Sequence, residues 1–335
     1  MNSFSSPAVA RHDPWRLCVA PMMDWTDRHC RAFHRVLAPS ARLYTEMVHA
    51  QAVIHGPRER LLGFDRCEQP LALQLGGADP GDLARAARVG ADWGYDEVNL
   101  NCGCPSDRVQ AGRFGACLMR EPALVADCVA AMRAAVSIPV TVKCRLGVDE
   151  QEDYASLVDF IDTVAQAGCD TFIVHARKAW LKGLSPKENR EIPPLRYDFV
   201  ERLKRERPRL RIIINGGIRA PDTAHALLAS LDGVMLGRIA YHEPFVLNRL
   251  DAELNGRPVV ERAELLRRFL PYVEARCRAG VALKHISRHL LGLFHGEPGG
   301  RRFRQILSQE ASRPMAGPEL LLRALASTQT PSRAA

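Results

Sequence analysis

The chain has 335 residues, with 46 Lys and Arg against 38 Asp and Glu and a net charge of +8. Hydrophobic residues make up 47% and charged residues 25%, which is typical of a soluble globular protein and excludes a disordered chain, a fibrous repeat or a small disulfide scaffold. No apolar run reaches the length of about 18 residues that a transmembrane helix needs, and the N-terminus lacks the apolar stretch of a secretory signal. The ten scattered cysteines are therefore expected to be reduced thiols in the cytoplasm.

Short apolar or β-branched runs recur from the N-terminus onward, each followed by a stretch that suits a helix. Eight are predicted as strands: Leu17–Pro21, Leu43–Val48, Leu71–Leu75, Glu97–Asn101, Val140–Arg145, Thr171–His175, Arg211–Asn215 and Gly233–Leu236. Alternating strands and helices predict a parallel sheet, and eight such units match a closed (β/α)8 barrel, the TIM barrel. A doubly wound open sheet is the alternative, but a Gly-rich fingerprint usually follows its first strand, and here Ala20-Pro21-Met22-Met23 follows instead.

After residue 255 the strand pattern disappears. Three helices are predicted, at Glu261–Ala279, Val281–Phe294 and Glu319–Ala326. We therefore expect four parts: a flexible N-terminal arm at 1–14, a barrel domain at 15–250, a helical domain at 255–327 and a polar tail at 328–335.

The charge is placed unevenly between these parts. From Asn255 to the C-terminus there are 14 Lys and Arg against 6 Asp and Glu, so this segment carries the whole net charge of +8. The excess predicts either a solvated basic surface or a module that binds a polyanion beside a neutral barrel.

In barrels of this kind the functional groups lie at the C-terminal ends of the strands. Nearly every predicted strand here ends in a polar or conformationally special residue: Pro21, Met22, Met23, Thr45, Glu46, Gln74, Asn99, Asn101, Lys143, Arg145, His175, Arg177, Asn215, Gly216, Gly217, Gly237 and Arg238. One such residue could be structural. Eight strands that each end in such a residue are hard to explain by stability, because buried polar groups without partners are costly.

The last two strand ends predict a phosphate site. Glycines in Asn215-Gly216-Gly217 and at Gly237 let the backbone approach a ligand, and Arg238 adds a charge-assisted contact. Lys143 ends an apolar strand and needs an anionic partner, such as the N1/O2 edge of a reduced flavin. Gln74 could hydrogen-bond the ring edge. FMN fits this set, and pyridoxal phosphate is the alternative because it also requires a lysine and a phosphate site.

The loop after the fourth strand places two thiols, Cys102 and Cys104, two residues apart. This spacing is too short for a standard zinc site, no other cysteine cluster supports an iron–sulfur centre, and a disulfide between such neighbours would be strained. No metal is expected. Proton transfer by a thiol remains, and Cys104, between Gly103 and Pro105, is better placed than Cys102. The alternative is a pair of unreactive loop cysteines.

These motifs, in order and spacing, resemble the tRNA-dihydrouridine synthase family. The resemblance rests on Ala20-Pro21-Met22, Gln74-Leu75-Gly76, Asn101-Cys102-Gly103-Cys104-Pro105, Lys143-Cys144-Arg145, His175-Ala176-Arg177, Asn215-Gly216-Gly217 and Gly237-Arg238, and it covers about residues 15–310. The segment Gly183–Leu195 resembles the signature of the bacterial branch that acts at D-loop positions 20 and 20a. Cys102 departs from the family, which more often has an apolar residue there.

The resemblance implies an enzyme in which NADPH reduces FMN, hydride passes to C6 of a uracil in tRNA, and Cys104 protonates C5. It implies FMN contacts from Pro21, Met22, Met23, Gln74, Lys143, His175, Asn215, Gly216, Gly217, Gly237 and Arg238. It implies tRNA contacts from Asn101, Lys187, Arg190, Arg301 and Arg304. The basic tail agrees with a tRNA partner, whose target base must leave its stack to be reduced. A monomer is expected.

Two other functions remain open from the sequence. One is an FMN barrel of the dihydroorotate or dihydropyrimidine dehydrogenase kind that acts on a free pyrimidine, which would not need the basic tail or the 183–195 segment. The other is a non-catalytic tRNA-binding protein, which would not need Cys104 and Lys143.

Overall fold

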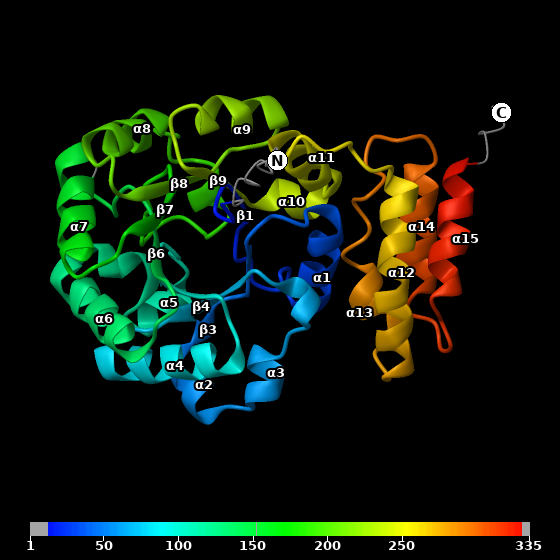
Figure 1. Cartoon of the computed structure of the whole chain (residues 1–335), viewed down its shortest axis with the longest axis horizontal. Coiled ribbons are helices and arrows are strands. Elements are labelled where there is room, and N and C mark those ends of the chain that lie inside the picture. Colours follow the sequence, from blue (N-terminus) through cyan, green and yellow to red (C-terminus); the bar gives the residue numbers. More distant parts are fainter. Residues whose placement is uncertain (1–12, 152, 330–335) are drawn as a thin grey trace, which may run out of the picture.

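The computed structural model describes residues 13–151 and 153–329. Within them one parallel sheet runs in the order β1-β9-β8-β7-β6-β5-β4-β2, with β3 also paired to β4 (Figure 1). The strands are β1 Leu17–Val19, β2 Leu43–Tyr44, β3 Val48–His49, β4 Leu71–Gly76, β5 Glu97–Cys102, β6 Val140–Cys144, β7 Thr171–His175, β8 Arg211–Asn215 and β9 Gly233–Leu236.

The two ends of this sheet meet and close it. The amide of Val19 donates to the carbonyl of Arg42 at 3.0 Å, and the amide of Arg42 donates to the carbonyl of Leu17 at 2.9 Å. The (β/α)8 barrel predicted from the sequence is therefore confirmed.

The second predicted strand, Leu43–Val48, is divided into β2 and β3. Between them the hydroxyl of Thr45 accepts a hydrogen bond from the amide of Gln74 at 3.1 Å, so a side chain replaces a carbonyl in the ladder. Thr45 is buried there, Glu46 accepts from the amide of Asp24, and the chain pairs with β4 again at Val48.

Helices lie between the strands and cover the outside of the barrel. They are α1 Arg28–Leu37, α2 Ala50–His55, α3 Arg58–Leu62, α4 Pro80–Trp93, α5 Asp107–Ala111, α6 Pro122–Ala135, α7 Tyr154–Gln166, α8 Tyr197–Glu206, α9 Pro221–Leu228, α10 Arg238–His242 and α11 Phe245–Leu254, with short 3-10 turns η1 Arg66–Glu68, η2 Gly115–Arg120 and η3 Glu188–Arg190. In α4, Asp79 caps the N-terminus and Gly94 follows the last turn with a φ of 101°. Both ends of α4 thus carry residues that favour helix termini.

Four helices form the C-terminal region: α12 Arg262–Arg278, α13 Leu283–Ser287, α14 Gly300–Glu310 and α15 Glu319–Gln329. The helix predicted over Val281–Phe294 ends at Ser287, so its second half was wrong. Turns follow from residue 288, and among them the backbone of Gly292 packs so closely on His242 that a Cβ there would lie 2.2 Å from the His242 carbonyl oxygen.

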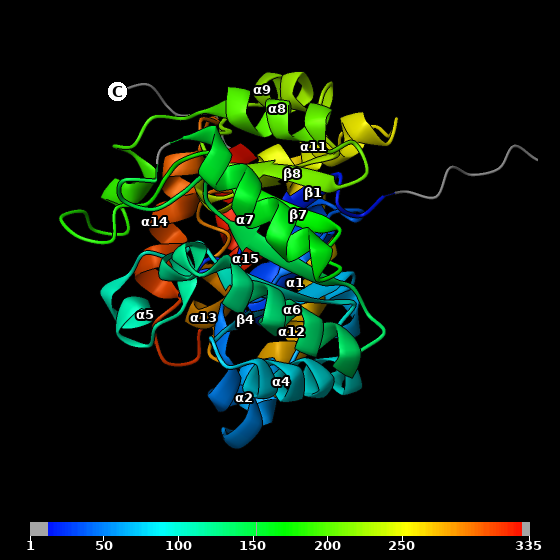
Figure 2. The ribbon, with the colours of Figure 1, turned by 90° about the vertical axis from the view of Figure 1, so that its left-hand side faces the viewer.

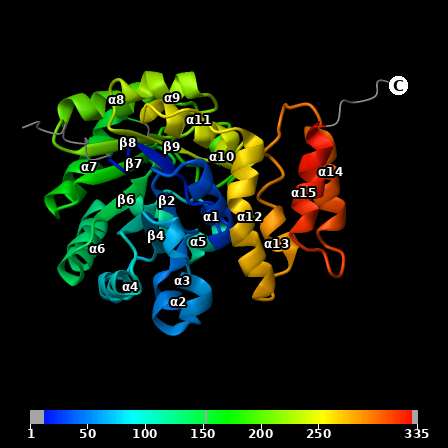
Figure 3. The ribbon, with the colours of Figure 1, turned by 45° about the vertical axis from the view of Figure 1, so that its right-hand side comes forward.

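Figure 3 shows α12 and α13 between the barrel and the outer pair α14 and α15. Phe33 of α1 and Phe269 of α12 pack with ring centroids 5.2 Å apart, and one hydrophobic core runs from the barrel into the C-terminal helices. Asp27, the N-cap of α1, also bonds Arg288 at 2.6 Å and His289 at 3.0 Å. The helical region is thus fixed to the barrel through both apolar and charged contacts.

Parts of the predicted arm (1–14) and tail (328–335) lie outside the described residues, which begin at Asp13 and end at Gln329. Among the described helices, none combines the length and the apolar character that a membrane span requires.

Candidate active site

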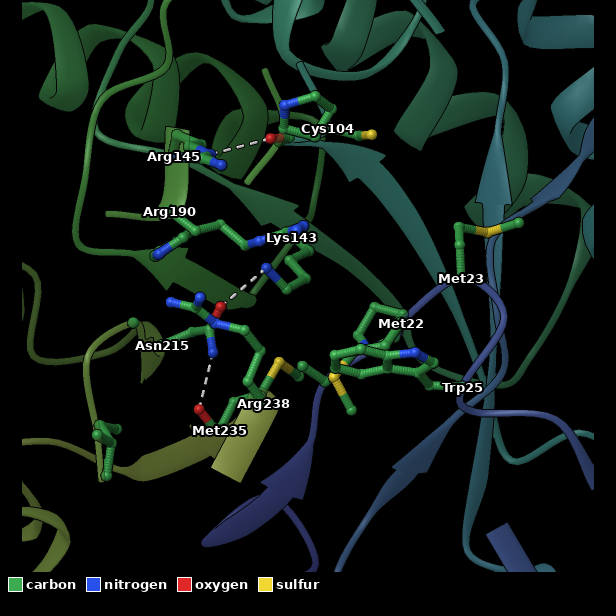
Figure 4. Close-up of a pocket in the computed structure, with 18 of the residues that line it drawn as sticks. Met22, Met23, Trp25, Cys104, Lys143, Arg145, Arg190, Asn215, Met235 and Arg238 are labelled. Carbon is green, nitrogen blue, oxygen red and sulfur yellow. Dashed lines mark hydrogen bonds between the residues drawn. The ribbon is translucent and has the colours of Figure 1, made fainter. Parts of the chain in front are cut away.

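A cavity of about 700 Å³ opens at the C-terminal ends of the strands. All the residues predicted to contact a cofactor line it: Pro21, Met22, Met23, Gln74, Lys143, His175, Asn215, Gly216, Gly217, Gly237 and Arg238. They come from six strand ends that are distant in the sequence. In Figure 4, Cys104 and Arg145 lie at one end of the cavity and Met235 and Arg238 at the other, with Lys143 between them.

A chain of amide hydrogen bonds joins the strand ends on one wall. Asn101 donates from Nδ2 to Oε1 of Gln74 at 2.9 Å, and Gln74 donates from Nε2 to Oδ1 of Asn99 at 2.8 Å. Oδ1 of Asn101 accepts from the amides of Gly103 and Cys104, both at 3.0 Å. Asn101, predicted as a tRNA contact, therefore also fixes the backbone that carries Cys104.

Lys143 is a half-buried cation without a carboxylate partner among the described residues. Its Nζ donates to Oδ1 of Asn215 at 3.1 Å, and Asn215 donates in turn to the carbonyl of Met235 at 2.8 Å. Burial lowers the pKa of Lys143 to about 8, with a further contribution from the nearby Arg145 guanidinium. The cavity therefore holds a cation that an anionic ligand would stabilise.

Arg145 is a second buried cation in the cavity. Its guanidinium donates only to backbone carbonyls, those of Gly103 at 3.0 Å, Lys178 at 3.1 Å and Asn189 at 2.8 Å. Burial lowers the pKa of Arg145 to about 10. Carbonyl dipoles satisfy its donors but leave its charge uncompensated, which adds to the positive potential of the site.

His175 stands beside these cations and is neutral. Its pKa lies well below the ordinary value because the ring is buried, and because Arg145 and Lys143 repel a further positive charge. The ring is packed against Gly216, where a Cβ would lie 2.4 Å from Cδ2 of His175. Gly216 has a φ of 107°, a conformation that favours glycine, and its carbonyl accepts from the Tyr197 hydroxyl at 2.7 Å.

The predicted phosphate loops border the cavity. Gly237 has open space where a Cβ would point, so the backbone there is accessible to a ligand. Arg238 forms an ion pair with Glu191, which belongs to the 183–195 segment. This pair joins the loop after β9 to the segment after β7, and no pattern in the sequence predicts it.

The two thiols of the loop after β5 have different environments. Cys104 lines the cavity and is partly exposed, with Sγ 3.4 Å from Oγ of Ser106. Cys102 is 0% exposed in the barrel wall, and burial raises its pKa well above the ordinary value. Only Cys104 of this pair can meet a ligand in the cavity.

The predicted tRNA residues are divided between the cavity and the surface. Asn101 and Arg190 line the cavity, whereas Lys187, Arg301 and Arg304 do not. Figure 2 shows α5, α14 and the bright green segment after β7 on the same side of the molecule. Within the described part of the chain, neither Arg301 nor Arg304 forms an ion pair.

Several cavity residues were not predicted as site residues: Trp25, Met47, Arg145, Arg219, Met235, His242 and Glu243. The sequence places Arg145 at a strand end and in the Lys143-Cys144-Arg145 motif but indicates no role for its side chain. Trp25 follows Pro21 in the same loop, and this proximity to a predicted cofactor contact would have indicated that Trp25 lines the cavity. Its indole stacks on Tyr241 of α10, with centroids 4.5 Å apart and planes at 11°, a contact that no sequence pattern indicates. The described residues contain no cluster of three or more metal-ligating side chains.

Together, the fold and the cavity define a (β/α)8-barrel protein with a cationic ligand site and one accessible thiol at its edge. The family model described as "Dihydrouridine synthase (Dus)" matches residues 18–329, and the chain belongs to this family. The resemblance drawn from the sequence is confirmed.

Curated relatives match over nearly the whole chain. A tRNA-dihydrouridine(20/20a) synthase of Xanthomonas campestris pv. campestris is 66% identical over 327 residues, covering 98% of each chain. Proteins with the same name from Synechocystis sp. and Vibrio parahaemolyticus are 56% and 54% identical, over 94% and 93% of this chain and 95% and 96% of theirs.

Two solved structures share the fold at low sequence identity. A 2-naphthoyl-CoA reductase complex has a TM-score of 0.54 at 11% identity, covering 72% of this chain and 50% of that chain. Morphinone reductase has a TM-score of 0.50 at 13% identity, covering 74% and 87%. The present chain thus spans half the length of the first of these proteins, and the two likenesses concern the fold alone.

Proposed function

We propose that this protein is a tRNA-dihydrouridine synthase that reduces the C5–C6 bond of uridine at D-loop positions 20 and 20a, with FMN as cofactor and NADPH as reductant. Family membership and the relatives named tRNA-dihydrouridine(20/20a) synthase support the activity. The observation that carries the proposal is the uncompensated Lys143 and Arg145 pair in a cavity that also holds the accessible thiol of Cys104.

The residues of the cavity fit FMN. A flavin phosphate suits the backbone at Gly216, Gly217 and Gly237, with Arg238 beside it, and Lys143 suits the electron-rich edge of the reduced ring. Bound FMN, once reduced by NADPH, supplies the hydride for C6. Pyridoxal phosphate is not favoured, because the family reaction is a reduction.

We assign further FMN contacts to the remaining cavity residues. Pro21, Met22 and Met23 would lie along the ring, Gln74 and His175 would face its polar atoms, and Asn215 would hold the ammonium group of Lys143 in place. The neutral state of His175 lets its ring accept as well as donate a hydrogen bond.

Cys104 is proposed to deliver the proton to C5. The carboxamide of Asn101 fixes the backbone amide of Cys104 at 3.0 Å, so the thiol starts from a defined position at the cavity edge. A positioned general acid contributes about 10²–10⁴ to a rate. Burial of Cys102 removes the competing thiol.

The tRNA contacts are proposed to extend from the cavity to the helical region, 255–327, as a tRNA-binding domain beside the FMN-binding barrel, 15–250. Arg190 and Asn101 would meet the extruded nucleotide, while Lys187, Arg301 and Arg304 would bind phosphates. A free pyrimidine would make no use of the basic surface residues, so the dehydrogenase alternative is not favoured. We expect a monomer that works in the cytoplasm, where tRNA and NADPH are found together; its cysteines are all free thiols.

The test is chemical analysis of tRNA. Mass spectrometry of tRNA from a strain lacking this protein, before and after incubation with the purified protein, FMN and NADPH, should show uridine converted to dihydrouridine at positions 20 and 20a. Absence of conversion by protein that carries FMN would refute the proposal.

A further inference from the structure

One side chain ties together two loops that frame the cavity. Gln110 of α5 donates from Nε2 to the carbonyl of Pro105 at 2.7 Å and to the carbonyl of Leu181 at 2.7 Å. Pro105 directly follows Cys104, and Leu181 leads into the segment with Lys187 and Arg190. Gln110 itself does not line the cavity, so any effect on chemistry passes through the loops it holds.

The segment after β7 that Gln110 contacts is held together by the side chain of Asn189. The carboxamide of Asn189 accepts from the amide of Trp180 at 2.7 Å and donates to the carbonyls of Trp180 at 2.9 Å and Leu184 at 3.1 Å. Asn189 is 0% exposed. Because the side chain of Asn189, the last residue of the segment, bonds its first residue and its middle, residues 180–189 are expected to move as one unit.

Arg145 fastens the same two loops nearer the strands. Its guanidinium joins the carbonyl of Gly103, on the Cys104 loop, to the carbonyls of Lys178 and Asn189. Gln110 makes the second contact between these loops, through the carbonyl of Pro105, which follows Cys104 in the chain. The two contacts hold the backbone on both sides of Cys104 to the segment after β7.

We propose that Gln110 is a positioning residue for tRNA reduction, which keeps the Cys104 loop at a fixed place relative to the RNA-facing segment after β7, which contains Lys187 and leads directly into Arg190. This rests on the proposed function, in which that segment holds tRNA and Cys104 gives its proton to C5 of the uracil. RNA docked on the segment sets where C5 lies. Since a displacement of about 1 Å can cost roughly 100-fold in rate, the link between docking surface and acid determines the efficiency of proton transfer.

Two substitutions at Gln110 distinguish the effect of its hydrogen bonds from the effect of its side-chain volume. Gln110→Met keeps the length of the side chain and removes both donors. Gln110→Glu keeps the shape but turns an oxygen toward two carbonyl oxygens, so it repels where the wild type bonds. The matched control is Gln69→Met, which removes a side-chain bond of 2.9 Å to the carbonyl of Gly94, outside the cavity.

The experiment follows both halves of the reaction on FMN-loaded protein. In Gln110→Met we expect wild-type FMN content and wild-type reduction of the flavin by NADPH. Single-turnover formation of dihydrouridine at saturating tRNA should fall about 10- to 100-fold, with tRNA affinity unchanged. Iodoacetamide should alkylate Cys104 faster, because the released loop exposes the thiol more often. Gln69→Met should match wild type in every measurement.

Wild-type turnover rates and wild-type alkylation in Gln110→Met and Gln110→Glu would overturn the proposal, as would an equal loss of turnover in Gln69→Met. If Gln110→Glu does not fold, the turnover and alkylation rates of Gln110→Met alone test the proposal. A wild-type protein that binds FMN but forms no dihydrouridine would instead refute the proposed function, and the alkylation rates would still report whether Gln110 holds the Cys104 loop.

Discussion

Replacing Lys143 by Met removes the ammonium group from the cavity and tests whether this site is built for an anion. In the cofactor-free protein, burial and the neighbouring Arg145 lower the pKa of Lys143 to about 8. FMN carries its negative charge on the phosphate, and its ring edge can accept a hydrogen bond from the ammonium group, so bound FMN favours the charged form of Lys143 and raises that pKa. Anion binding is therefore coupled to proton uptake at any pH where the free protein has lost the Lys143 proton.

Below pH 8 Lys143 is already protonated, so FMN affinity is highest and nearly independent of pH. Above pH 8 each further pH unit lowers FMN affinity by up to a factor of ten. Wild-type protein should therefore bind FMN about tenfold more weakly at pH 9 than at pH 7. His175 stays neutral in this range, and Arg145, with a pKa of about 10, stays charged. Neither group therefore contributes to the pH dependence of FMN affinity between pH 7 and pH 9.

Lys143→Met has no such proton to take up, so its FMN affinity should not change between pH 7 and pH 9. At pH 7 it should bind about 10- to 100-fold more weakly than wild type, as expected for the loss of a hydrogen bond from a charged group. At saturating FMN, reduction by NADPH should also be slower, because the ammonium group stabilises the anionic reduced ring.

The assay is titration of apoprotein with FMN at pH 7, 8 and 9, followed by quenching of flavin fluorescence. Lys284→Met, an exposed lysine of α13, is the control and should follow the wild-type profile. Parallel pH profiles for wild type and Lys143→Met would refute the electrostatic role of Lys143.

Three other predictions concern the thiol, the phosphate loop and the basic surface. Cys104→Ala should bind FMN and tRNA but form dihydrouridine about 10²–10⁴-fold more slowly, measured by nucleoside mass spectrometry; wild-type rates would remove its role as the acid. Gly216→Val should purify without FMN, seen in the flavin absorbance, because φ is 107° and the new Cβ would lie 2.4 Å from His175; full occupancy would contradict the phosphate site. Arg301→Ala combined with Arg304→Ala should weaken tRNA binding and reduce the slope of log affinity against log salt concentration by about 1–2. An unchanged slope would mean that these two arginines belong to a solvated basic surface.

The order of strands and helices followed from the sequence because both patterns are local. Apolar runs of strand length alternate with helical stretches, and the carboxyl ends of parallel strands meet at one face of a barrel. Most residues at those ends, including Gln74, Lys143 and His175, therefore line one cavity although they are far apart in the chain. Thr45, Glu46, Asn99 and Arg177 lie at strand ends too but do not line it.

The tertiary structure alone decided how these groups are held and which of them are accessible. The neighbours Gly103 and Pro105 favoured Cys104 over Cys102 in the sequence, but only the fold shows that Cys102 is buried in the barrel wall and that Cys104 lines the cavity. The bond from Gln110 to Leu181 joins residues 71 positions apart. Such contacts depend on how loops from different strands pack, and packing is set by the shape of the whole barrel, so no local period or spacing in the sequence encodes them.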